Sequence, residues 1–360
     1  MRLLCISSHD DTLNSVRPEA ELFIGLAKHG IDVTVMTEGD SVYVPMMREA
    51  GIRVIDHACR RKISLQSIRA IRRQLQRDST DIVYAFNNKA ICNANIAAIG
   101  LPVKVVTYRG QTGNIHRLDP SCYLTHLNPG VARVICVANA VRDDLRQQHP
   151  HPERVITVYK GHDLDWYRDE PASLAEFGIG RDAFVVACVA NNRPRKGIPV
   201  LVEASYSLPV EANIHILLIG AGMDEEKLQK AIAASPMRER IHCLGHRADA
   251  PAIVAACHAS VLPSLKREGL PKTVIESMAY GVTPIVSDTG GSAELVVDGV
   301  SGIVVAPGAA RDIAAAIRYL YENPTERALM GKRARDRIHT HFNVRQSVAQ
   351  TAEQLQSLLD

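Results

Sequence analysis

Two glutamates, Glu268 and Glu276, enclose seven residues in the segment KREGLPKTVIESMAYG (266–281). A glycine, a leucine and a proline directly follow the first glutamate, and an apolar pattern typical of a helix surrounds the second. A carboxylate can accept hydrogen bonds from two neighbouring hydroxyls, such as those of a sugar diol. The spacing therefore suggests one diol-binding carboxylate before a helix and another within it.

The helix start between the two glutamates has the features of an anion site. Pro271 suits the first helical position, because its missing N–H costs nothing there and its φ is already helical. The amides around Lys272 and Thr273 are then unpaired at the positive end of the helix dipole, where phosphate binds, and Gly269 allows the backbone to come close. Gly281 is expected to end the helix in a left-handed conformation.

These groups predict an order of binding along the segment. Glu276 lies in the second turn of the expected helix, where a phosphate would repel it, so its carboxylate suits a ribose diol. Glu268 precedes the helix and would lie beyond the phosphates, where the hydroxyls of a phosphate-linked group belong. We therefore expect nucleoside, diphosphate and sugar to bind in that order.

The elements that must position these residues are also readable. Strand-length apolar runs alternate with helical patterns along the chain, which is typical of parallel, helix-covered sheets. At 360 residues the chain exceeds the ~250–300 at which one core stops growing. We expect an α/β protein with two doubly wound, Rossmann-like domains facing across a cleft, and ligands at the carboxyl ends of the strands.

The periodicity is lost at 169–179, which we expect to be a linker. It separates an N-terminal domain, 1–168, from a C-terminal domain, 180–341, and the amphipathic segment 343–360 is expected to be a helix that packs back on the first domain. The pattern predicts strands at 3–8, 32–37, 53–57, 81–86, 103–110, 133–138, 184–190, 214–220, 241–245, 259–264, 283–288 and 302–306, and helices at 19–30, 197–207, 224–234, 271–280, 310–322 and 343–360.

The composition is that of a globular protein, with 46% apolar and 22% charged residues. No apolar run approaches the ~18 residues of a bilayer span, and the N-terminus lacks the pattern of a signal peptide. The eight cysteines are scattered without a C-x-x-C pair, which predicts buried thiols in a reducing compartment. We expect a cytoplasmic protein, which could lie peripherally on the inner face of the cytoplasmic membrane.

One segment, 59–77, holds much of the positive charge of the N-terminal half. Apolar residues share one helical face and arginines the other: Ile68, Ile71 and Leu75 against Arg69, Arg72, Arg73 and Arg77. Two interpretations remain open, a solvated basic face and a patch that contacts anionic lipid headgroups or an anionic acceptor. Aromatic residues for base stacking are scarce, which argues against a nucleic-acid partner.

The segment EGLPKTVIESMAYGVTPIVSDTGGSAELVVDGVSGIVV (268–305) closely resembles the E-x7-E block of family-4 retaining glycosyltransferases, which have the GT-B fold. VACVANNRPRKGIPVLVEA resembles that family's phosphate loop, ILLIGAGMDEEKLQ its G-x-G turn, and CVANAVRDDL and VYKGHDLDWY the end of its N-terminal domain. Across 1–130 the resemblance is mainly architectural. It implies transfer of a hexose-type sugar from a nucleotide diphosphate sugar, most commonly a UDP-sugar, to an acceptor held by the N-terminal domain, with retention at the anomeric carbon.

Carried over residue by residue, the resemblance assigns roles around the donor. Glu276 would bind the ribose hydroxyls and Glu268 the donor hexose. The amides near Leu270, Lys272 and Thr273 would hold the distal phosphate.

The same resemblance covers the loop that carries Lys196 and the turn that contains Gly220. Lys196 corresponds to the family's phosphate-binding lysine, whose charge offsets the one that builds on the leaving diphosphate. The family usually has an arginine five residues earlier, but that position is Asn191 here. We favour Arg193 as the second phosphate partner, with Arg195 as the alternative.

Two other departures from the family fall in the acceptor domain. The first loop, SHDDTLNSVRPEAE (8–21), lacks the glycine pair of many members, so Arg17 or Ser15 could contact an anionic acceptor or the phosphates. Arg109 stands where the family often has a histidine, and His116 follows further along that loop. An arginine there suggests contact with a charged group, and we count Arg109 and His116 among the candidate acceptor contacts.

Neither a metal nor a dinucleotide cofactor is expected. Asp163 and Asp165 have the D-x-D spacing of some metal sites, but they lie at the expected domain junction, and basic groups with a helix terminus can neutralise a diphosphate without an ion. Gly220 and Gly222 could belong to a dinucleotide fingerprint, but position 225 is a glutamate where the third glycine should be. We therefore expect the donor sugar nucleotide to be the bound small molecule.

Two alternatives to the transferase remain open. Sugar-nucleotide epimerases share the expected fold and donors, and a non-catalytic nucleotide-sugar-binding scaffold subunit would show the same donor motif. The basic N-terminal half is consistent with a lipid-linked acceptor, such as a lipopolysaccharide core or a surface polysaccharide precursor, and equally with a soluble glycan.

Overall fold

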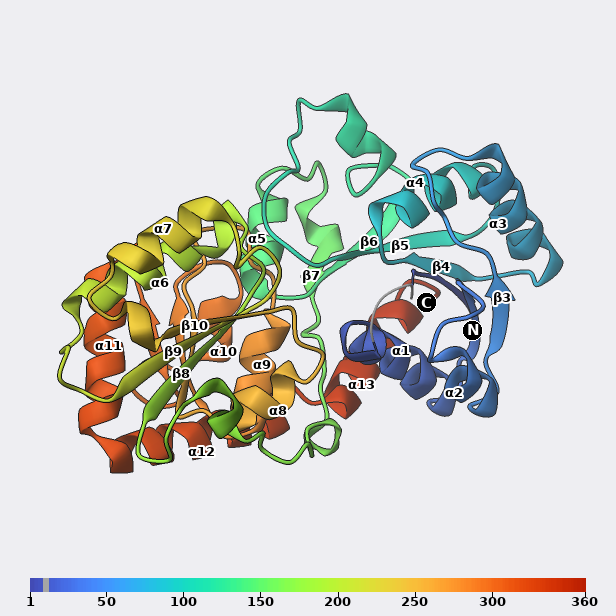
Figure 1. The fold of residues 1–360 in the computed structure, drawn as a ribbon. Coiled ribbons are helices and arrows are strands. Elements are labelled where there is room, and N and C mark those ends of the chain that lie inside the picture. Colours follow the sequence, from blue (N-terminus) through green and yellow to red (C-terminus); the bar gives the residue numbers. More distant parts are fainter. Residues whose placement is uncertain (9–12) are drawn as a thin grey trace. The chain divides into compact units, whose positions relative to one another are not determined.

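The computed structural model describes residues 1–8 and 13–360, with side chains given outside 9–15, and it divides into two compact units (Figure 1). Unit 1 comprises Met1–His162 and Phe342–Asp360, and unit 2 comprises Asp163–His341. Each unit is built on one parallel sheet with helices on both faces. The segment 169–179, expected to be a linker, lies in unit 2 and contains the short 3₁₀ helix η4 (Leu174–Phe177).

Unit 1 has a seven-stranded sheet in the order β3-β2-β1-β4-β5-β6-β7. Its strands are β1 (Arg2–Ile6), β2 (Asp32–Thr37), β3 (Arg53–Asp56), β4 (Ile82–Ala85), β5 (Lys104–Arg109), β6 (Val131–Cys136) and β7 (Val155–Thr157). Its helices are α1 (Leu13–Lys28), α2 (Val44–Glu49), α3 (Leu65–Arg77), α4 (Asn88–Ala97), α5 (Asn139–Arg146) and α13 (Val344–Gln356).

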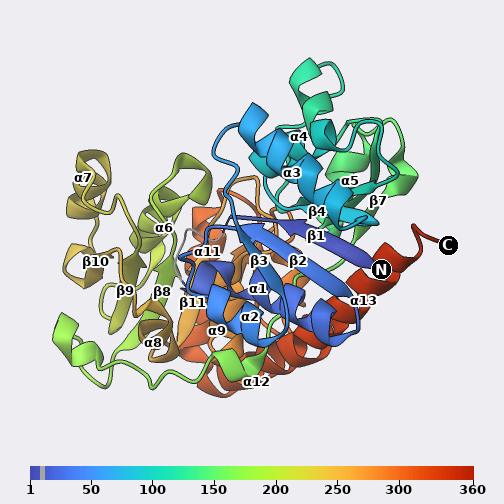
Figure 2. The same ribbon diagram turned by 90° about the vertical axis from the view of Figure 1, so that its right-hand side faces the viewer.

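The helices of unit 1 cover both faces of its sheet, as Figure 2 shows. On one face, α1, α2 and α13 bury their apolar sides against the strands, and on the other lie α3 and α4. The C-terminal helix is held by close packing on α1, where a Cβ on Gly25 would lie 2.3 Å from a methyl carbon of Val348. Glycine at position 25 therefore lets α13 complete this core.

Unit 2 has a six-stranded sheet in the order β10-β9-β8-β11-β12-β13. Its strands are β8 (Phe184–Val189), β9 (Ile214–Ile219), β10 (Ile241–Gly245), β11 (Ala259–Leu262), β12 (Thr283–Ser287) and β13 (Ile303–Val305). Its helices are α6 (Ile198–Ala204), α7 (Glu226–Ala234), α8 (Ala250–Ala255), α9 (Lys272–Ala279), α10 (Ser292–Leu295), α11 (Ala310–Glu322) and α12 (Pro324–His341).

In both sheets the strand order reverses next to the first strand of the unit. In unit 2 the reversal lies between β8 and β11, which pair directly. Loops leave these two strands in opposite directions, and this is where open α/β sheets bind ligands. A ligand site is therefore expected at the loops that follow β8 and β11.

Helix α9, which carries Glu276, is fixed by a backbone contact with α12. A Cβ on Gly331 of α12 would lie 2.0 Å from the carbonyl oxygen of Gly281, and the Arg335 guanidinium donates to the carbonyl of Ala279. Gly281 has φ +75°, which confirms the left-handed end predicted for this helix. The C-terminal end of α9 is thus held by two contacts with residues that are distant in the sequence.

The predicted α/β class with two doubly wound sheets is confirmed. Seven of the eight cysteines are buried, Cys243 is exposed, and none forms a disulfide. Within the described part of the chain, no helix combines the length and apolar character that a bilayer span requires. The sequence pattern missed strand β7, which has three residues, and the helices α2, α4, α5, α8, α10 and α12. It also placed the start of α1 at residue 19, whereas the helix begins at Leu13.

Candidate active site

The side chain of Glu268 is the centre of a polar cluster at the strand reversal of unit 2. Its Oε1 accepts hydrogen bonds from the Lys196 ammonium at 2.7 Å and from the Ser264 hydroxyl at 2.6 Å. Glu268 is only 4% exposed, so these two donors take the place of the water that would solvate its carboxylate at the surface. No described residue donates to Oε2, which leaves that oxygen able to accept from a ligand hydroxyl.

Ser264 is a residue that the motif analysis missed. It follows β11 within the Pro263-Ser264 pair, is fully buried, and reaches the carboxylate four positions later. A serine directly after a buried strand is a weak sequence signal, because most such residues only satisfy a turn.

Two glycines allow the surrounding loops to interlock. A Cβ on Gly197, whose φ is +68°, would lie 2.0 Å from the carbonyl oxygen of Pro263. A Cβ on Gly290, whose φ is +53°, would lie 2.1 Å from the carbonyl oxygen of Glu268. Any side chain at either position would push these loops apart. The cluster around Glu268 is therefore held by backbone contacts from both neighbouring loops.

The two arginines of the phosphate loop differ in what they contact. Arg195 donates to the carbonyl of Arg267 at 3.0 Å, and its own carbonyl accepts from the Leu265 amide at 2.8 Å. Arg193 is exposed, directly precedes the short helix η5 (Pro194–Lys196), and makes no side-chain hydrogen bond or ion pair with any described residue. Arg195 therefore ties the two loops together, while the Arg193 guanidinium is available to a ligand.

The second glutamate, Glu276, also has a lysine beside it. The Lys272 ammonium lies 3.1 Å from its Oε1, one helical turn away. Glu276 is 8% exposed, and burial raises the pKa of its carboxyl, with a smaller opposite effect from Lys272 and a further increase from Asp169. Tyr280, at the end of the same helix, donates to Asp169 at 2.5 Å. The fold therefore holds a carboxylate here at an electrostatic cost.

The start of α9 is uncapped. Pro271 occupies the N-cap position, one residue before the position predicted for it, and Lys272 is the first helical residue. No side chain caps this end, and among the residues described no acceptor is found for the Thr273 amide. Leu270 is half-buried and Gly269 buried directly before this turn. Together these residues form a loop–helix junction with a free N–H at the positive end of the helix dipole.

Gly220 lies at the carboxyl end of β9 and allows a close approach to the phosphate loop. Its φ is +151°, and a Cβ there would lie 2.3 Å from the carbonyl oxygen of Ala190. Asn191 accepts from the Ala221 amide at 3.0 Å, so the residue that replaces the family's arginine helps to hold this turn. Next to it is a pocket of about 650 Å³, lined by the 220–224 turn and by residues 243–246 at the carboxyl end of β10. Its volume is in the range of small-molecule sites.

The candidate acceptor residues lie in unit 1. Arg17 is half-buried in α1, and the side chain of Ser15 lies outside the described residues. Arg109 is 5% exposed, donates to the carbonyl of Gly113, and has a pKa that burial lowers. His116 is exposed on the following loop. The guanidinium of Arg109 is thus used to fold its own loop, whereas His116 is accessible.

The D-x-D pair has structural partners. Asp163 accepts from the Asp165 amide at 3.0 Å and caps the 3₁₀ helix η3 (Leu164–Trp166), and Asp165 pairs with Arg168 at 2.5 Å. Across the residues that the structure describes, no group of three or more His, Cys, Asp or Glu side chains could hold a metal ion.

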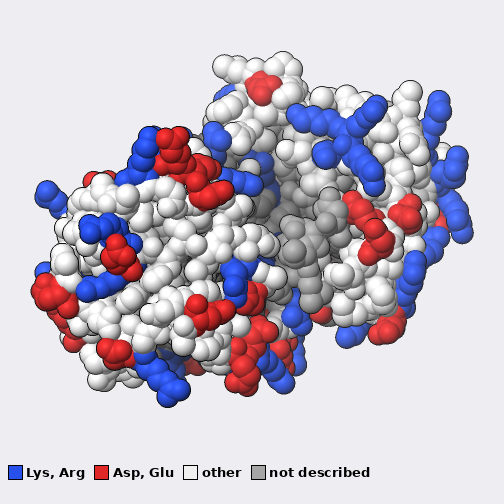
Figure 3. Space-filling model, in the orientation of Figure 1, with Lys and Arg blue, Asp and Glu red and all other residues white. Residues whose placement is uncertain are grey.

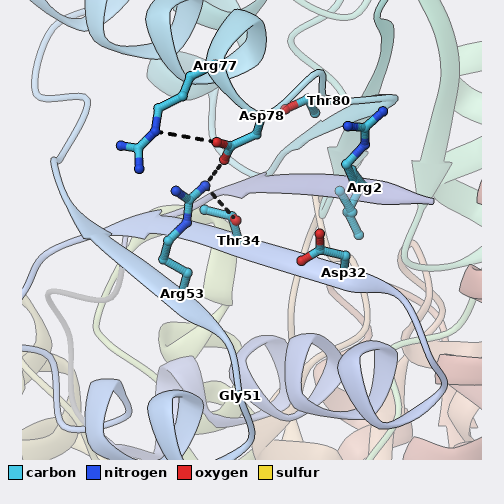
Figure 4. Close-up of a pocket in the computed structure, with 9 residues that line it drawn as sticks. Arg2, Asp32, Thr34, Gly51, Arg53, Arg77, Asp78 and Thr80 are labelled. Atoms are coloured by element: carbon cyan, nitrogen blue, oxygen red, sulfur yellow. Dashed lines mark hydrogen bonds and ion pairs between the residues drawn. The ribbon is translucent and has the colours of Figure 1, made fainter.

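A further pocket, of about 450 Å³, lies at the amino-terminal edge of the sheet in unit 1 (Figure 4). Figure 4 shows Arg53 between Asp78 and Thr34, with Arg77 directed toward the same aspartate at 3.8 Å. Arg2 lines it as well and pairs with Asp81 at 3.9 Å. Its arginines are balanced by aspartates, and it lies at the edge opposite the carboxyl ends of the strands. We therefore place the candidate site in unit 2.

Comparison with known proteins identifies the family of the chain. Residues 169–337 match the family model "Glycosyl transferases group 1", and residues 20–166 match "Glycosyltransferase Family 4", so that the two models together take in most of the chain. An Escherichia coli UDP-Gal:alpha-D-GlcNAc-diphosphoundecaprenol alpha-1,3-galactosyltransferase is 27% identical over 300 residues, which cover 78% of this chain and 76% of that protein.

An uncharacterized glycosyltransferase of Methanocaldococcus jannaschii is 25% identical over 224 residues, which cover 60% of this chain and 56% of that protein, so the chain spans less than two thirds of this relative. The crystal structure of Anabaena HepE in complex with UDP is similar over 99% of this chain and 100% of that one, with a TM-score of 0.79 and 22% identity. The two family models show that the chain belongs to the glycosyltransferases of group 1 and family 4, and the similarity to the solved structure shows that it has the GT-B fold.

Proposed function

We propose that the protein is a retaining glycosyltransferase that moves a hexose-type sugar from a nucleotide diphosphate sugar, a UDP-sugar, to a glycan or lipid-linked acceptor. The observation that carries this proposal is the cluster at the strand reversal of unit 2. There a lysine, a serine and a buried glutamate meet, 2.7 and 2.6 Å apart, beside an uncapped helix start. Such a cluster offers one cation and a free helix N–H to a diphosphate and a carboxylate to a sugar.

Each part of the sugar nucleotide then has a binding partner in unit 2. The Glu276 carboxylate accepts from the ribose hydroxyls, and the free Oε2 of Glu268 accepts from a hydroxyl of the hexose. The Thr273 amide and those of Leu270 and Lys272 hold the distal phosphate. The pocket beside Gly220 is of a size to receive the nucleobase.

The cations act on the leaving group. As the bond between the anomeric carbon and the phosphate oxygen breaks, its electron pair leaves with the diphosphate, and the charges of Lys196 and Arg193 stabilise it there. The acceptor oxygen bonds to the same face of that carbon, and its proton passes to the departing phosphate oxygen. This front-face route needs no protein nucleophile and gives retention. It also needs no metal, because the two cations and the helix start neutralise the diphosphate.

The relatives support the substrate class. The Escherichia coli relative is named for a UDP-galactose donor and a diphosphoundecaprenol acceptor, and Anabaena HepE was crystallised with UDP. We therefore propose a UDP-sugar donor, a lipid-linked acceptor of lipopolysaccharide or surface polysaccharide synthesis, and work at the inner face of the cytoplasmic membrane. Unit 1 would hold the acceptor, with Arg17 and His116 as candidate contacts and Arg109 as the residue that shapes the loop before His116.

The test is turnover. The protein is incubated with UDP-glucose, UDP-galactose or UDP-N-acetylglucosamine and a short-chain lipid diphosphate sugar, and UDP release and product are followed, with the anomeric configuration read by NMR. We expect UDP release that depends on the acceptor, and an α product from an α donor. Inversion would refute the retaining mechanism. Epimerised donor without transfer would indicate the isomerase, and donor binding without turnover would indicate a scaffold.

A further inference from the structure

Exposed basic side chains gather in unit 1 at the carboxyl edge of its sheet. They stand on the loop from β3 to α3 and at the start of α4: Arg60, Arg61, Lys62 and Lys89. Figure 3 shows Lys and Arg gathered over this part of unit 1, with acidic residues beside them. None of these four forms an ion pair or a side-chain hydrogen bond with any part of the chain that the structure describes. Their charges are therefore not used to hold the fold.

The backbone beneath these cations is rigidly fixed. Asn93 of α4 is fully buried, and its amide nitrogen donates to the carbonyls of Arg61 at 2.9 Å, Lys62 at 3.1 Å and Lys89 at 2.7 Å. Its amide oxygen accepts from the Ser64 amide at 2.9 Å. One buried side chain thus joins the two segments that carry the cations. The cluster is a built feature of the fold and not a set of independent surface residues.

Apolar side chains protrude from the same short segment. Ile63 is 52% exposed and Leu65 is 69% exposed, although Ile71 and Leu75 of the same helix are fully buried. Ile71 and Leu75 form the face of α3 that packs into the core. The core contacts of α3 therefore do not depend on Ile63 and Leu65, which stay largely exposed next to the basic residues.

We infer that this surface, Arg60, Arg61, Lys62, Ile63, Leu65 and Lys89, docks the protein on an anionic phospholipid bilayer. The cations face the phosphates of the headgroups, and the two apolar side chains enter the interface below them. A soluble polyanion would be bound by the cations alone, which leaves Ile63 and Leu65 unexplained. The inference rests on the proposed function in one respect, since a lipid-linked acceptor gives a transferase reason to lie on the bilayer.

The basic helix face that the sequence suggested contributes less than its composition implied. Arg72 donates to the carbonyls of Ala97 at 2.9 Å and Ile99 at 2.7 Å, so it holds α3 on α4. Arg77 lies beside Asp78 at 3.8 Å. Arg69 and Arg73 stay exposed and make no side-chain hydrogen bond or ion pair with a described residue. Half of the arginine face is therefore used within the fold, and the other half adds to the charge of the loop before the helix.

The experiment is sedimentation of the full chain with vesicles of phosphatidylcholine alone and of phosphatidylcholine mixed with phosphatidylglycerol. We expect binding only to the anionic vesicles, weakened by salt. Replacing Arg60, Arg61 and Lys62 by alanine together should weaken binding roughly a hundredfold, at about fivefold per cation. Ile63→Ser with Leu65→Ser should weaken binding while leaving its salt dependence unchanged.

A matched control removes three exposed cations from unit 2, Arg311, Lys332 and Arg333, and should bind vesicles as the wild type does. Equal binding to both vesicle types, or unchanged binding by the triple variant of unit 1, would overturn the proposal. So would displacement of the protein from vesicles by inorganic pyrophosphate with no effect of the Ile63 and Leu65 changes, which would indicate a soluble anion site. UDP binding is also measured without vesicles. A protein that binds UDP but not vesicles contradicts the docking surface alone, whereas a protein that does not bind UDP contradicts the donor site.

Discussion

The ammonium of Lys196 and the Glu268 carboxylate, 72 positions apart in the chain, lie 2.7 Å apart in the fold. The lysine comes from the loop after β8 and the glutamate from the loop after β11, the two strands between which the sheet order reverses. Neither side chain is freely solvated, at 18% and 6% exposure. The pair is therefore preorganised, and a diphosphate that enters would meet a cation already held in place.

Replacing Lys196 by alanine should lower kcat roughly 100- to 1000-fold, because the charge on the leaving diphosphate loses its main partner. The donor KM should change less, since the interaction is strongest in the transition state. Initial rates of UDP release measure both constants. Lys266→Ala is the matched control, because that lysine is exposed on the neighbouring loop without a partner among the described residues. Loss of activity in both variants would contradict the assignment.

Ser264→Ala should lower kcat about tenfold with little change in KM, because a buried hydrogen bond to a charged group contributes about 1.5 kcal/mol or more. The hydroxyl positions the Glu268 carboxylate and is not itself expected to touch the donor. Ser205→Ala is the control, since Ser205 is also fully buried and hydrogen-bonded, to Val202 and Ser235, away from the cluster. If both variants lose only thermal stability and keep kcat, Ser264 has no positioning role.

Glu276→Gln should raise the melting temperature at neutral pH while it weakens nucleotide binding. Burial raises the pKa of this carboxyl above its ordinary 4.5, so the folded state holds the proton more tightly than the unfolded state. Stability contributed by the group is then lost as the pH rises from 4.5 through the raised pKa. Glutamine cannot ionise and escapes this loss.

Thermal melts of both proteins across this pH range check the sign. The melting temperatures should converge as the pH falls below 4.5, where the wild-type carboxyl is protonated in both states. A variant that is less stable than wild type at neutral pH would show that the Lys272 contact outweighs the burial of the charge.

Gly331→Ala should destabilise the protein by about 1–3 kcal/mol, because the new Cβ would collide with the backbone of Gly281 and neither helix can move without repacking. Since α9 carries Glu276, UDP affinity should fall as well. Urea unfolding measures the first effect and calorimetry the second. Lys332→Ala, an exposed neighbour on α12, should leave both unchanged. A Gly331→Ala protein with wild-type stability would mean that α12 adjusts freely.

The sequence predicted the sheets better than the contacts between loops. Strand runs such as 32–37 and 241–245 coincide with β2 and β10, because buried parallel strands are continuous apolar stretches between charged or glycine-containing turns. Strand β7 has only three residues, and α12 buries few side chains, among them Met330, Ala334 and Ile338, so neither has a clear periodic signal. The pairing of Lys196 with Glu268 and the role of Ser264 are tertiary and leave no local pattern.

Arg109 is a second residue whose partner in the fold could not be predicted from the sequence. An arginine where the family often has a histidine suggested contact with a charged group of the acceptor. The structure buries its guanidinium against the carbonyl of Gly113, whose amide donates to Asp144 at 2.7 Å. The resemblance assigned the backbone amide of Lys272 to phosphate but gave no partner for its side chain. The contact of that side chain with Glu276 follows from the i,i+4 spacing on a helix. Spacing indicated which residues could meet, but not which partner each would take.

A calorimetric titration of UDP, GDP, ADP and NAD into wild type and Glu276→Ala, with magnesium and with a chelator, tests the donor site most directly. We expect UDP to bind, its affinity to survive chelation, and the loss of Glu276 to weaken it at least about tenfold, since hydrogen bonds to a carboxylate are lost. Binding of NAD alone, binding that requires magnesium, or equal UDP affinity in both proteins would contradict a metal-independent nucleotide-sugar site at Glu276.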